Sequence, residues 1–440
     1  MSGDVFIRRF SMESIWQKST KLPTFPQLCG SMNTDALIIG GGIAGILTAF
    51  FLKQNGIDCV LVEKGRICQG TSSYTTAKIT YQHGLIYHKL LKSGGLEAAQ
   101  KYLAANQIAF EKYEKLCRNI DCDYERKDNY VYSVSDRAKL ETEISALERI
   151  GYRAELCENI SLPFSTVGAV KFPCQAQFNP LKFISAIAEG LSIYENTFVK
   201  EMRGNTAVTD TGNITAKAVI VTTHFPFINN HGSYFLKLYQ HRSYVVALEN
   251  AQDVCGMYVD ESRKGLSLRN YGKYLLLGGG AHRTGKEGGN WSELSQFARL
   301  YYPYSKEYCR WAAQDCMSLD DVPYIGKYSG KTHQLFTASG FNKWGMTGAM
   351  AAAQLLCDMV QGKRNNLADI FNPSRSILRP QLFINGFEAV TNLLTFTGKR
   401  CPHLGCALKW NKAEHSWDCA CHGSRFDENG RVLDNPANGK

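Results

Sequence analysis

The sequence has no apolar run long enough to be assigned to a membrane span. Its longest nearly apolar stretch, Ala36–Leu52, has 17 residues and includes four glycines, so a tight turn entering a helix explains it better. The first 30 residues contain no apolar core of signal-peptide length. We therefore expect a cytoplasmic protein without a transmembrane segment, in which residues 1–34 form an irregular leader that packs onto the body.

The sequence also lacks the basic runs and aromatic platforms that accompany nucleic-acid binding, although its net charge is +10. A solvated basic surface accounts for this charge, and the excess of cations could also favour an acidic redox partner. Eleven of the fifteen cysteines are scattered singly, as in a reducing compartment, whereas four lie within residues 401–421. This second group predicts a specific site.

Residues 35–63 follow the pattern of a dinucleotide-binding unit. An apolar strand ends in a glycine turn, a helix follows, and a second apolar strand ends at an acidic residue. In this pattern Gly40 allows the tight turn, Gly42 lets a pyrophosphate approach the backbone, and Gly45 lets the helix pack closely on the strand. The first helical residues, Ile43 and Ala44, offer free N–H groups to the phosphates.

Glu63 lies 18 residues beyond Gly45, where its carboxylate can accept hydrogen bonds from a ribose. A glycine turn in an ordinary α/β sheet would leave this acid unexplained. The chain continues through Lys64 into a hydroxyl-rich loop that contains Thr71 and Thr76. We expect this loop to follow the cofactor towards its redox ring, and a surface loop is the alternative.

Two later segments are predicted to return to the cofactor. The apolar strand 218–223 carries Thr222, and the apolar strand 335–338 runs into a second glycine junction followed by a helix of small residues. The positive end of that helix can point at the cofactor. The residues assigned to this junction are Gly340, Trp344, Gly345, Met346 and Thr347. Between these strands, residues 225–330 alternate in polarity and predict a mostly antiparallel inserted sheet.

Residues 35–362 resemble the D-amino-acid-oxidase-like FAD oxidoreductases, the family of glycine oxidase. The resemblance rests on the first glycine turn with Glu63, the turn Asp320–Gly326, and Ser339–Gly348 before the last helix. It implies an α/β fold with a Rossmann-like FAD domain and a mostly antiparallel substrate domain. It also implies FAD rather than NAD, and oxidation of the C–N bond of an amino acid or amine by hydride transfer to the flavin.

Three residues are candidates for the substrate site. Arg269 and Arg283 end predicted strands, where either could hold a substrate carboxylate bidentately or lie on the surface. Leu268-Arg269 resembles the family strand that presents a carboxylate-binding arginine, with leucine in place of the usual proline. His83 could face the flavin ring or be a hydrogen-bonded core histidine.

The C-terminal part supplies a second set of ligands. Residues 363–385 are polar, contain two prolines and predict a linker to a domain at 386–440. Two loops there, C-x-H and C-x-x-H, are separated by fifteen residues, and each offers one thiolate and one imidazole. A tetrahedral zinc site uses the same ligand types but another spacing, and a cysteine cluster without a ligand is a further alternative. The four candidate ligands are Cys401, His403, Cys419 and His422.

These loops resemble the Rieske iron–sulfur fingerprint, down to Cys-Pro-His-Leu-Gly-Cys and Cys-His-Gly-Ser-Arg-Phe. The resemblance implies a [2Fe–2S] cluster with one iron on Cys401 and Cys419 and the other on His403 and His422. It also implies a disulfide, which in Rieske proteins of the respiratory type links the positions of Cys406 and Cys421. Few residues precede the first loop, so we expect an abridged all-β domain.

Together these patterns predict a dehydrogenase that passes electrons from the flavin to the cluster. The acceptor is unknown, with an acidic redox protein or a quinone as candidates. A flavoprotein whose cluster senses redox state, a non-catalytic electron-transfer protein, and an NAD-linked dehydrogenase with structural zinc are the alternatives.

Overall fold

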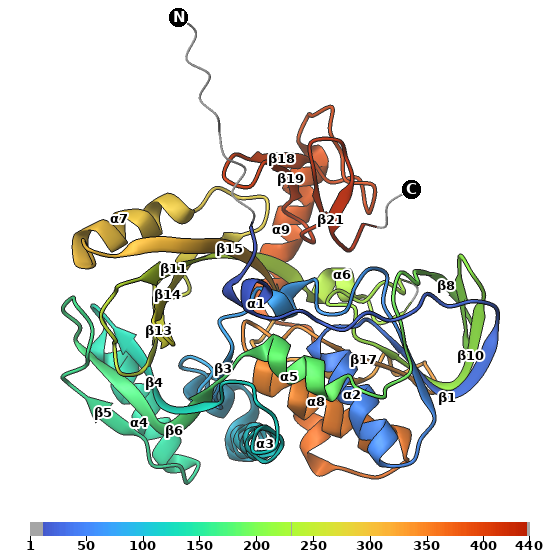
Figure 1. Ribbon diagram of the computed structural model, residues 1–440, viewed down its shortest axis with the longest axis horizontal. Helices are drawn as coiled ribbons and strands as arrows, with labels where there is room; N and C mark the ends of the chain where they lie inside the picture. The colour runs from blue at the N-terminus through green and yellow to red at the C-terminus, as the bar shows by residue number, and fades with distance from the viewer. Residues whose placement is uncertain (1–11, 230, 438–440) are drawn as a thin grey trace, which may run out of the picture.

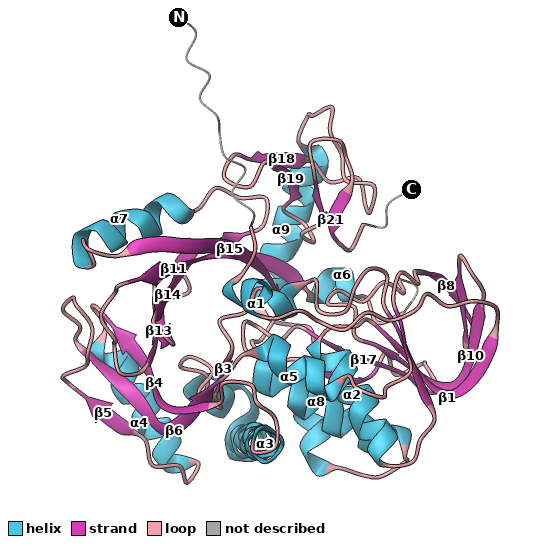
Figure 2. Ribbon diagram, in the orientation of Figure 1, coloured by secondary structure: helices cyan, strands magenta, loops and turns pink. Residues whose placement is uncertain are grey.

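The computed structural model describes residues 12–229 and 231–437. They form two large sheets, with helices packed against them, and a small third sheet near the C-terminus (Figures 1 and 2). In the described ranges, no helix has the length and apolar character needed to cross a bilayer. The predicted α/β fold with a small C-terminal β domain is confirmed.

An eight-stranded sheet carries the predicted dinucleotide unit. Five of its strands run parallel in the order β17-β10-β1-β2-β7, and β16 joins the edge antiparallel. Such a parallel core is buried on both faces, which explains the continuous apolar runs of β1 and β2. The strands are β1 (Met32–Ile39), β2 (Cys59–Val62), β7 (Ile193–Tyr194), β8 (Val199–Arg203), β9 (Thr206–Thr209), β10 (Asn213–Val221), β16 (Tyr324–Lys327) and β17 (Leu335–Ser339).

A nine-stranded, mostly antiparallel sheet forms the second layer, in the order β15-β11-β14-β13-β12-β4-β6-β3 with β5 beside β6. It draws strands from two stretches of the chain, and the limits 225–330 cover only the second. The first stretch supplies β3 (Lys78–Ile79), β4 (Glu125–Ser133), β5 (Glu155–Cys157) and β6 (Gly168–Gln177). The second supplies β11 (Tyr239–Glu249), β12 (Met257–Asp260), β13 (Ser267–Tyr271), β14 (Tyr274–Arg283) and β15 (Lys306–Met317).

Helices fill the space around the two sheets, and α2, α5 and α8 lie side by side (Figure 1). Their apolar residues share one core with the facing strands. The described α-helices are α1 (Ile15–Ser19), α2 (Ile43–Gln54), α3 (Tyr87–Cys117), α4 (Arg137–Arg149), α5 (Pro180–Ile187), α6 (Tyr234–Lys237), α7 (Trp291–Tyr301), α8 (Gly345–Val360) and α9 (Pro380–Leu394). Two 3₁₀ helices, η1 (Thr71–Ser73) and η2 (Asn366–Phe371), complete the list.

The C-terminal unit consists of α9 and a four-stranded antiparallel sheet at one end of the molecule (Figure 2). Helix α9 begins inside the predicted linker 363–385 and continues past its end. The strands are β18 (Leu408–Asn411), β19 (Ser416–Cys419), β20 (Arg425–Phe426) and β21 (Val432–Asp434). Residues 1–11 of the expected leader lie outside the described residues. In its described part, α1 packs onto the body through Trp16, which is fully buried.

Candidate cofactor and substrate sites

The turn after β1 requires glycine at two positions. Gly40 has φ +113°, and a Cβ there would lie 2.7 Å from the carbonyl oxygen of Thr222. A Cβ on Gly45 would lie 2.0 Å from the carbonyl oxygen of Gly40. At Gly42 a Cβ would meet only the Ser72 hydroxyl, at 3.4 Å. The turn is therefore closed on the strand side and open where a pyrophosphate would approach, which fits a dinucleotide.

Two side chains brace this turn. Glu63, just after β2, accepts hydrogen bonds from the backbone N–H groups of Gly41 at 2.7 Å and Gly65 at 3.0 Å. The Thr222 hydroxyl contacts the carbonyl oxygens of Ile39 and Gly40 at 3.1 and 3.0 Å. Both predicted residues thus lie at the turn, with the Glu63 carboxylate beside the first glycines. The neighbouring Lys64 is exposed.

The start of α2 meets the hydroxyl-rich loop. Gly42 at the N-cap has no side chain to satisfy the first turn, and the N–H of Ile43 donates instead to the Ser72 hydroxyl at 3.0 Å. This free helix end, which includes Ala44, suits a phosphate. The neighbouring Thr71 donates to the Gln314 carbonyl oxygen at 2.9 Å, so the loop also contacts the second sheet. Sequence reasoning selected Thr71 and Thr76 from this loop and missed Ser72.

Helix α8 begins at the late glycine junction without a side-chain cap. Gly340 has φ +71°, which allows the sharp exit from β17. Residues Gly345 and Met346 form the first turn, and the Thr347 hydroxyl donates to the Thr80 carbonyl oxygen at 2.9 Å. The uncapped end therefore presents free N–H groups, as predicted for a helix that faces the cofactor.

His83 lies against this junction and is buried. Its ring stacks on Trp344 with centroids 5.1 Å apart, and Nδ1 lies 2.7 Å from the Tyr102 hydroxyl. Its Nε2 lies 2.9 Å from both the Thr80 carbonyl oxygen and the Thr347 hydroxyl. Burial lowers the pKa of His83 to about 3, so the imidazole is neutral at physiological pH. These contacts are those of a hydrogen-bonded core histidine, one of the two alternatives for His83.

Arg269 is 1% exposed and forms no ion pair with a carboxylate of the described residues. Its Nε donates to the Thr76 carbonyl oxygen and its Nη1 to the Gln177 side chain at 2.7 Å, whereas its buried Nη2 has no hydrogen-bond partner in the described residues. The guanidinium also lies 5.3 Å from the Trp16 ring. Burial lowers its pKa to about 9, and it remains charged at pH 7. A buried cation with a free donor suits an anionic ligand.

Lys78 is a second buried cation in this region, and sequence reasoning did not select it. It pairs in register with Gln177, the residue whose side chain holds Arg269, and it is 8% exposed. Burial, followed by the charge of Arg269, lowers the pKa of Lys78 to about 7. Within the described chain the ammonium group of Lys78 has neither a hydrogen bond nor an ion pair. The only sequence signal was a lysine at the end of the hydroxyl-rich loop.

Arg283, the other candidate for a substrate carboxylate, binds the C-terminal domain instead. Its Nε donates to the Ala420 carbonyl oxygen at 2.9 Å, Nη2 to that of Cys421 at 3.2 Å, and Nη1 to the Asn385 side chain at 2.8 Å. The guanidinium therefore holds the second ligand loop against β14. Sequence spacing could not reveal this, because the partners lie over 100 residues away along the chain.

The two ligand loops have matching backbone turns. Gly405 donates to the carbonyl oxygen of Cys401 at 2.9 Å, and Gly423 donates to that of Cys419 at 3.0 Å. Both glycines have positive φ, +76° and +84°. These equivalent turns bring the ligand side chains of the two loops towards each other.

The four ligand side chains come together as two pairs, one of imidazoles and one of thiols. The imidazole centroids of His403 and His422 are 5.0 Å apart, and the thiols of Cys401 and Cys419 share a hydrogen bond. Both ring nitrogens of His403 and Nδ1 of His422 are buried without partners in the described residues. Two thiols and two imidazoles with unused donors fit a [2Fe–2S] cluster of the Rieske type. Nearby, Cys406 and Cys421 form a disulfide between the loops.

The cluster histidines contact the body directly. Nε2 of His422 lies 3.0 Å from the Phe235 carbonyl oxygen, which leaves Nδ1 for a metal. The Phe225 ring lies edge-on to both imidazoles, 6.2 Å from that of His403 and 6.0 Å from that of His422. Phe225 is three residues beyond Thr222, which braces the glycine turn. The two candidate cofactor sites are thus joined by a short segment after β10.

A buried ion network fixes the C-terminal unit to the second sheet. Glu414 accepts from Arg242 of β11, whose Nε lies 3.0 Å away, and from Arg425 at 2.7 Å. Arg425 also donates to Asp418 and Asp434, each at 3.0 Å. Burial alone would raise the pKa of Glu414, but the two arginines outweigh it and lower the pKa to about 2. The interface therefore contains paired charges.

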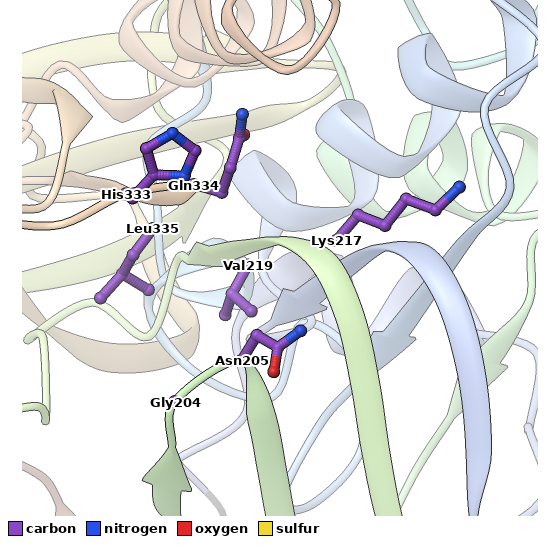
Figure 3. A pocket seen from close by; sticks show the side chains of 7 residues that line it. All are labelled: Gly204, Asn205, Lys217, Val219, His333, Gln334 and Leu335. Carbon is purple, nitrogen blue, oxygen red and sulfur yellow. The ribbon is translucent and has the colours of Figure 1, made fainter.

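A cavity of about 210 Å³ lies elsewhere, beside the middle of β10 and the start of β17. Figure 3 shows Lys217 and His333 among its lining side chains. It contains none of the predicted site residues, so we assign it no part in the function.

Comparisons with known proteins agree with both halves of this architecture. Residues 35–359 match the model of the FAD dependent oxidoreductase family, and residues 387–440 match the Rieske [2Fe-2S] domain. The chain is 34% identical to the Rieske 2Fe-2S iron-sulfur protein YhfW of Bacillus subtilis (strain 168), over 97% of this chain and 96% of that protein.

Two solved structures share the fold of the body. Glycine oxidase from Geobacillus kaustophilus covers 78% of this chain and 99% of its own, with 19% identity and a TM-score of 0.67. L-proline dehydrogenase from P. horikoshii covers 80% and 98%, with 16% identity and a TM-score of 0.66. The similarity to these two structures shows the fold of the body. At the C-terminal ligand loops, the match to the Rieske domain model replaces the zinc-site alternative.

Proposed function

Because the chain belongs to the FAD dependent oxidoreductase family and ends in a Rieske domain, we propose that it is a dehydrogenase of an amino acid or amine whose electrons leave through the cluster to an external acceptor. Its cofactors are FAD and a [2Fe–2S] cluster. When bound, FAD supplies a two-electron acceptor for C–N oxidation and the cluster a one-electron carrier.

The contact of Phe225 with both cluster histidines is the observation that carries this proposal. The same segment, residues 222–225, braces the glycine turn at one end and meets the cluster ligands at the other. This segment therefore connects the glycine turn, where the pyrophosphate would bind, to the cluster ligands, which supports a short path between the two cofactors. A cluster serving only as a sensor would not need this proximity.

The buried Arg269 supports an acidic substrate. Its free Nη2 can donate to a carboxylate, while Thr76 and Gln177 hold the rest of the guanidinium in place. Lys78 adds a second positive charge, on β3, directly opposite Gln177 in the sheet. The names of the similar structures, glycine oxidase and L-proline dehydrogenase, also favour an amino acid.

Anaerobic titration of the purified holoprotein with a panel of amino acids and amines tests the relay. We expect one class of substrate to bleach the flavin absorbance and to produce the EPR signal of the reduced cluster. Bleaching of the flavin while the cluster stays oxidised would contradict the relay and favour the sensor alternative. A flavin that no member of the panel reduces would favour a non-catalytic electron-transfer protein.

A matched pair of variants sharpens the same experiment. Phe225→Leu should slow reduction of the cluster in stopped-flow measurements without slowing reduction of the flavin. Phe297→Leu is the control, because Phe297 packs among Phe164 and Tyr301, in an aromatic group away from the cluster. If the cluster is reduced at the same rate in both variants, Phe225 is not on the electron path from the flavin to the cluster.

A further inference from the structure

Helix α9 is amphipathic in the reverse of the usual sense. Its exposed face carries Phe383, Phe387, Val390 and Leu394, which are 70%, 71%, 56% and 80% exposed. Their spacing of four, three and four residues puts them in one stripe along the helix. The protein side of α9 instead holds buried Asn385 and Asn392. Single exposed apolar residues are ordinary, but a complete stripe marks an interaction surface.

Hydrogen bonds and an ion pair on the polar side of α9 fix the orientation of the helix. Asn385 accepts from Arg283 at 2.8 Å, and Glu388 pairs with Lys286 at 2.6 Å. The carbonyl oxygen of Asn392 accepts from Ala407, which lies just after the first ligand loop. The outward direction of the apolar stripe is therefore set by specific contacts to the body and to the C-terminal domain.

The chain around α9 is strongly basic. Residues 374–412 carry six lysines and arginines but one acidic residue, Glu388. In the described part of the chain, one of the six, Arg375, forms an ion pair, with Asp320. The other five are Arg379, Lys399, Arg400, Lys409 and Lys412. A second copy of this chain on the same face would bring like charges together, whereas an anionic surface would be attracted.

We propose that α9 docks this protein onto the surface of an anionic lipid bilayer. An apolar stripe next to a basic segment is the combination that binds in the bilayer interface. The helix lies on the membrane rather than across it, because its 15 residues span about 22 Å against a hydrocarbon core of about 30 Å.

The docked orientation places the first ligand loop near the bilayer. Arg400 donates to the carbonyl oxygen of Leu393 on α9 at 3.1 Å and to that of Gly405 in the loop at 2.8 Å. Leu404, at the tip of the loop, is also exposed. The apolar surface of α9 thus continues to the residue next to His403.

Flotation of the full-length holoprotein with lipid vesicles tests the proposal. We expect it to float with vesicles of phosphatidylcholine and phosphatidylglycerol, less with phosphatidylcholine alone, and less as salt is added. The double variant Phe383→Ser, Phe387→Ser should lower the partition coefficient at least about ten-fold, since two large apolar side chains no longer enter the interface. Lys399→Gln should weaken binding to the anionic vesicles about five-fold.

Leu300→Ser is the matched control, because Leu300 is an equally exposed apolar residue on α7. It should float as the unaltered protein does, and flavin and cluster absorbance should show that every variant is folded. Flotation that is absent, or that the double variant retains in full, would overturn the proposal. If instead the double variant dissociates a dimer in sedimentation velocity and no form binds vesicles, the stripe holds a second copy. These outcomes do not depend on catalytic activity, so they leave the proposed dehydrogenase function unaffected.

Discussion

Two groups of buried cations, one at the contact with the C-terminal domain and one within the second sheet, differ in their partners. Arg242 and Arg425 share Glu414, and Arg425 also meets Asp418 and Asp434. Arg269 and Lys78 are as deeply buried but have no acidic partner among the described residues. The first group has its counter-charges within the chain, and the second does not.

This difference in partners suggests a structural role for the first group of cations and a ligand-binding role for the second. A buried cation without an anion is costly, and it persists where a ligand supplies the missing charge. A buried pair with full hydrogen bonding instead fixes how two parts of a protein fit together. The ion network at Glu414 therefore holds the Rieske domain against the body, whereas we propose that Arg269 and Lys78 bind an anionic substrate. Three variants test this distinction.

The largest effect is expected for Glu414→Gln. This change leaves Arg242 and Arg425 buried with one carboxylate fewer, which should lower the free energy of unfolding by about 3–5 kcal/mol. Urea unfolding of the holoprotein at pH 7 measures it. Because the folded pKa of Glu414 is about 2, below its unfolded value, its contribution is present at neutral pH and is lost as pH falls. The difference in free energy of unfolding between the variant and the parent protein should therefore become smaller at acid pH.

His415→Ala is the control for this experiment. His415 is the next residue, but its side chain is exposed, and among the described residues it pairs with exposed Glu428 and lies edge-on to the Trp410 ring. Its replacement should change the free energy of unfolding by less than about 1 kcal/mol. Equal losses in the two variants would mean that the buried network does not hold the domains together.

The sequence predicted the parts of the molecule that local geometry decides. Gly40 and Gly45 are required by contacts within the turn and with the adjacent strand, and both metal loops close on themselves within four residues. Such short-range constraints fix residue types and spacings that can be recognised in the sequence. The fold class and both cofactors could therefore be predicted.

Residues whose role depends on distant partners could not be predicted in this way. Arg283 ends β14, whereas Arg269 lies in the middle of β13 and not at a strand end as expected. Only the fold shows that Nη2 of Arg269 has no partner among the described residues and that Arg283 binds the Ala420 carbonyl. Glu414 is one acid among many in the sequence, and its partner Arg242 lies 172 residues away. In the sequence, the apolar stripe of α9 has the same spacing as a helix face that packs on a core. Only the structure shows that this face is exposed.

The second prediction concerns Arg269→Met. Loss of the free Nη2 donor should lower kcat/KM for a carboxylate-bearing substrate about 100-fold, since a charge-assisted hydrogen bond is worth about 1.5–3 kcal/mol. The free energy of unfolding should fall by less than about 1 kcal/mol, because an unpaired buried charge is removed together with its hydrogen bonds. Steady-state kinetics and urea unfolding of the same preparation measure the two quantities.

Arg283→Met provides the contrast to that variant. It removes the donors to the Ala420 and Cys421 carbonyl oxygens and should change the EPR spectrum or midpoint potential of the cluster, with substrate KM retained. If Arg283→Met instead raised KM and Arg269→Met did not, the two arginines would have exchanged the roles assigned here.

The smallest effect is expected for Lys78→Met, and it depends on pH. Burial holds the folded pKa of Lys78 near 7, below its unfolded value of about 10.5, so between these values the unfolded chain binds the extra proton. Lys78 therefore destabilises the ligand-free protein at and below neutral pH, and this cost fades as pH rises towards 10. Lys78→Met should be more stable by roughly 2 kcal/mol at pH 6 and by little at pH 10. Thermal unfolding at the two pH values measures the change, with exposed Lys412→Met as the control. A gain independent of pH would mean that the lysine finds a counter-charge in the folded protein, and the comparison with Arg242 and Arg425 would then fail at this residue.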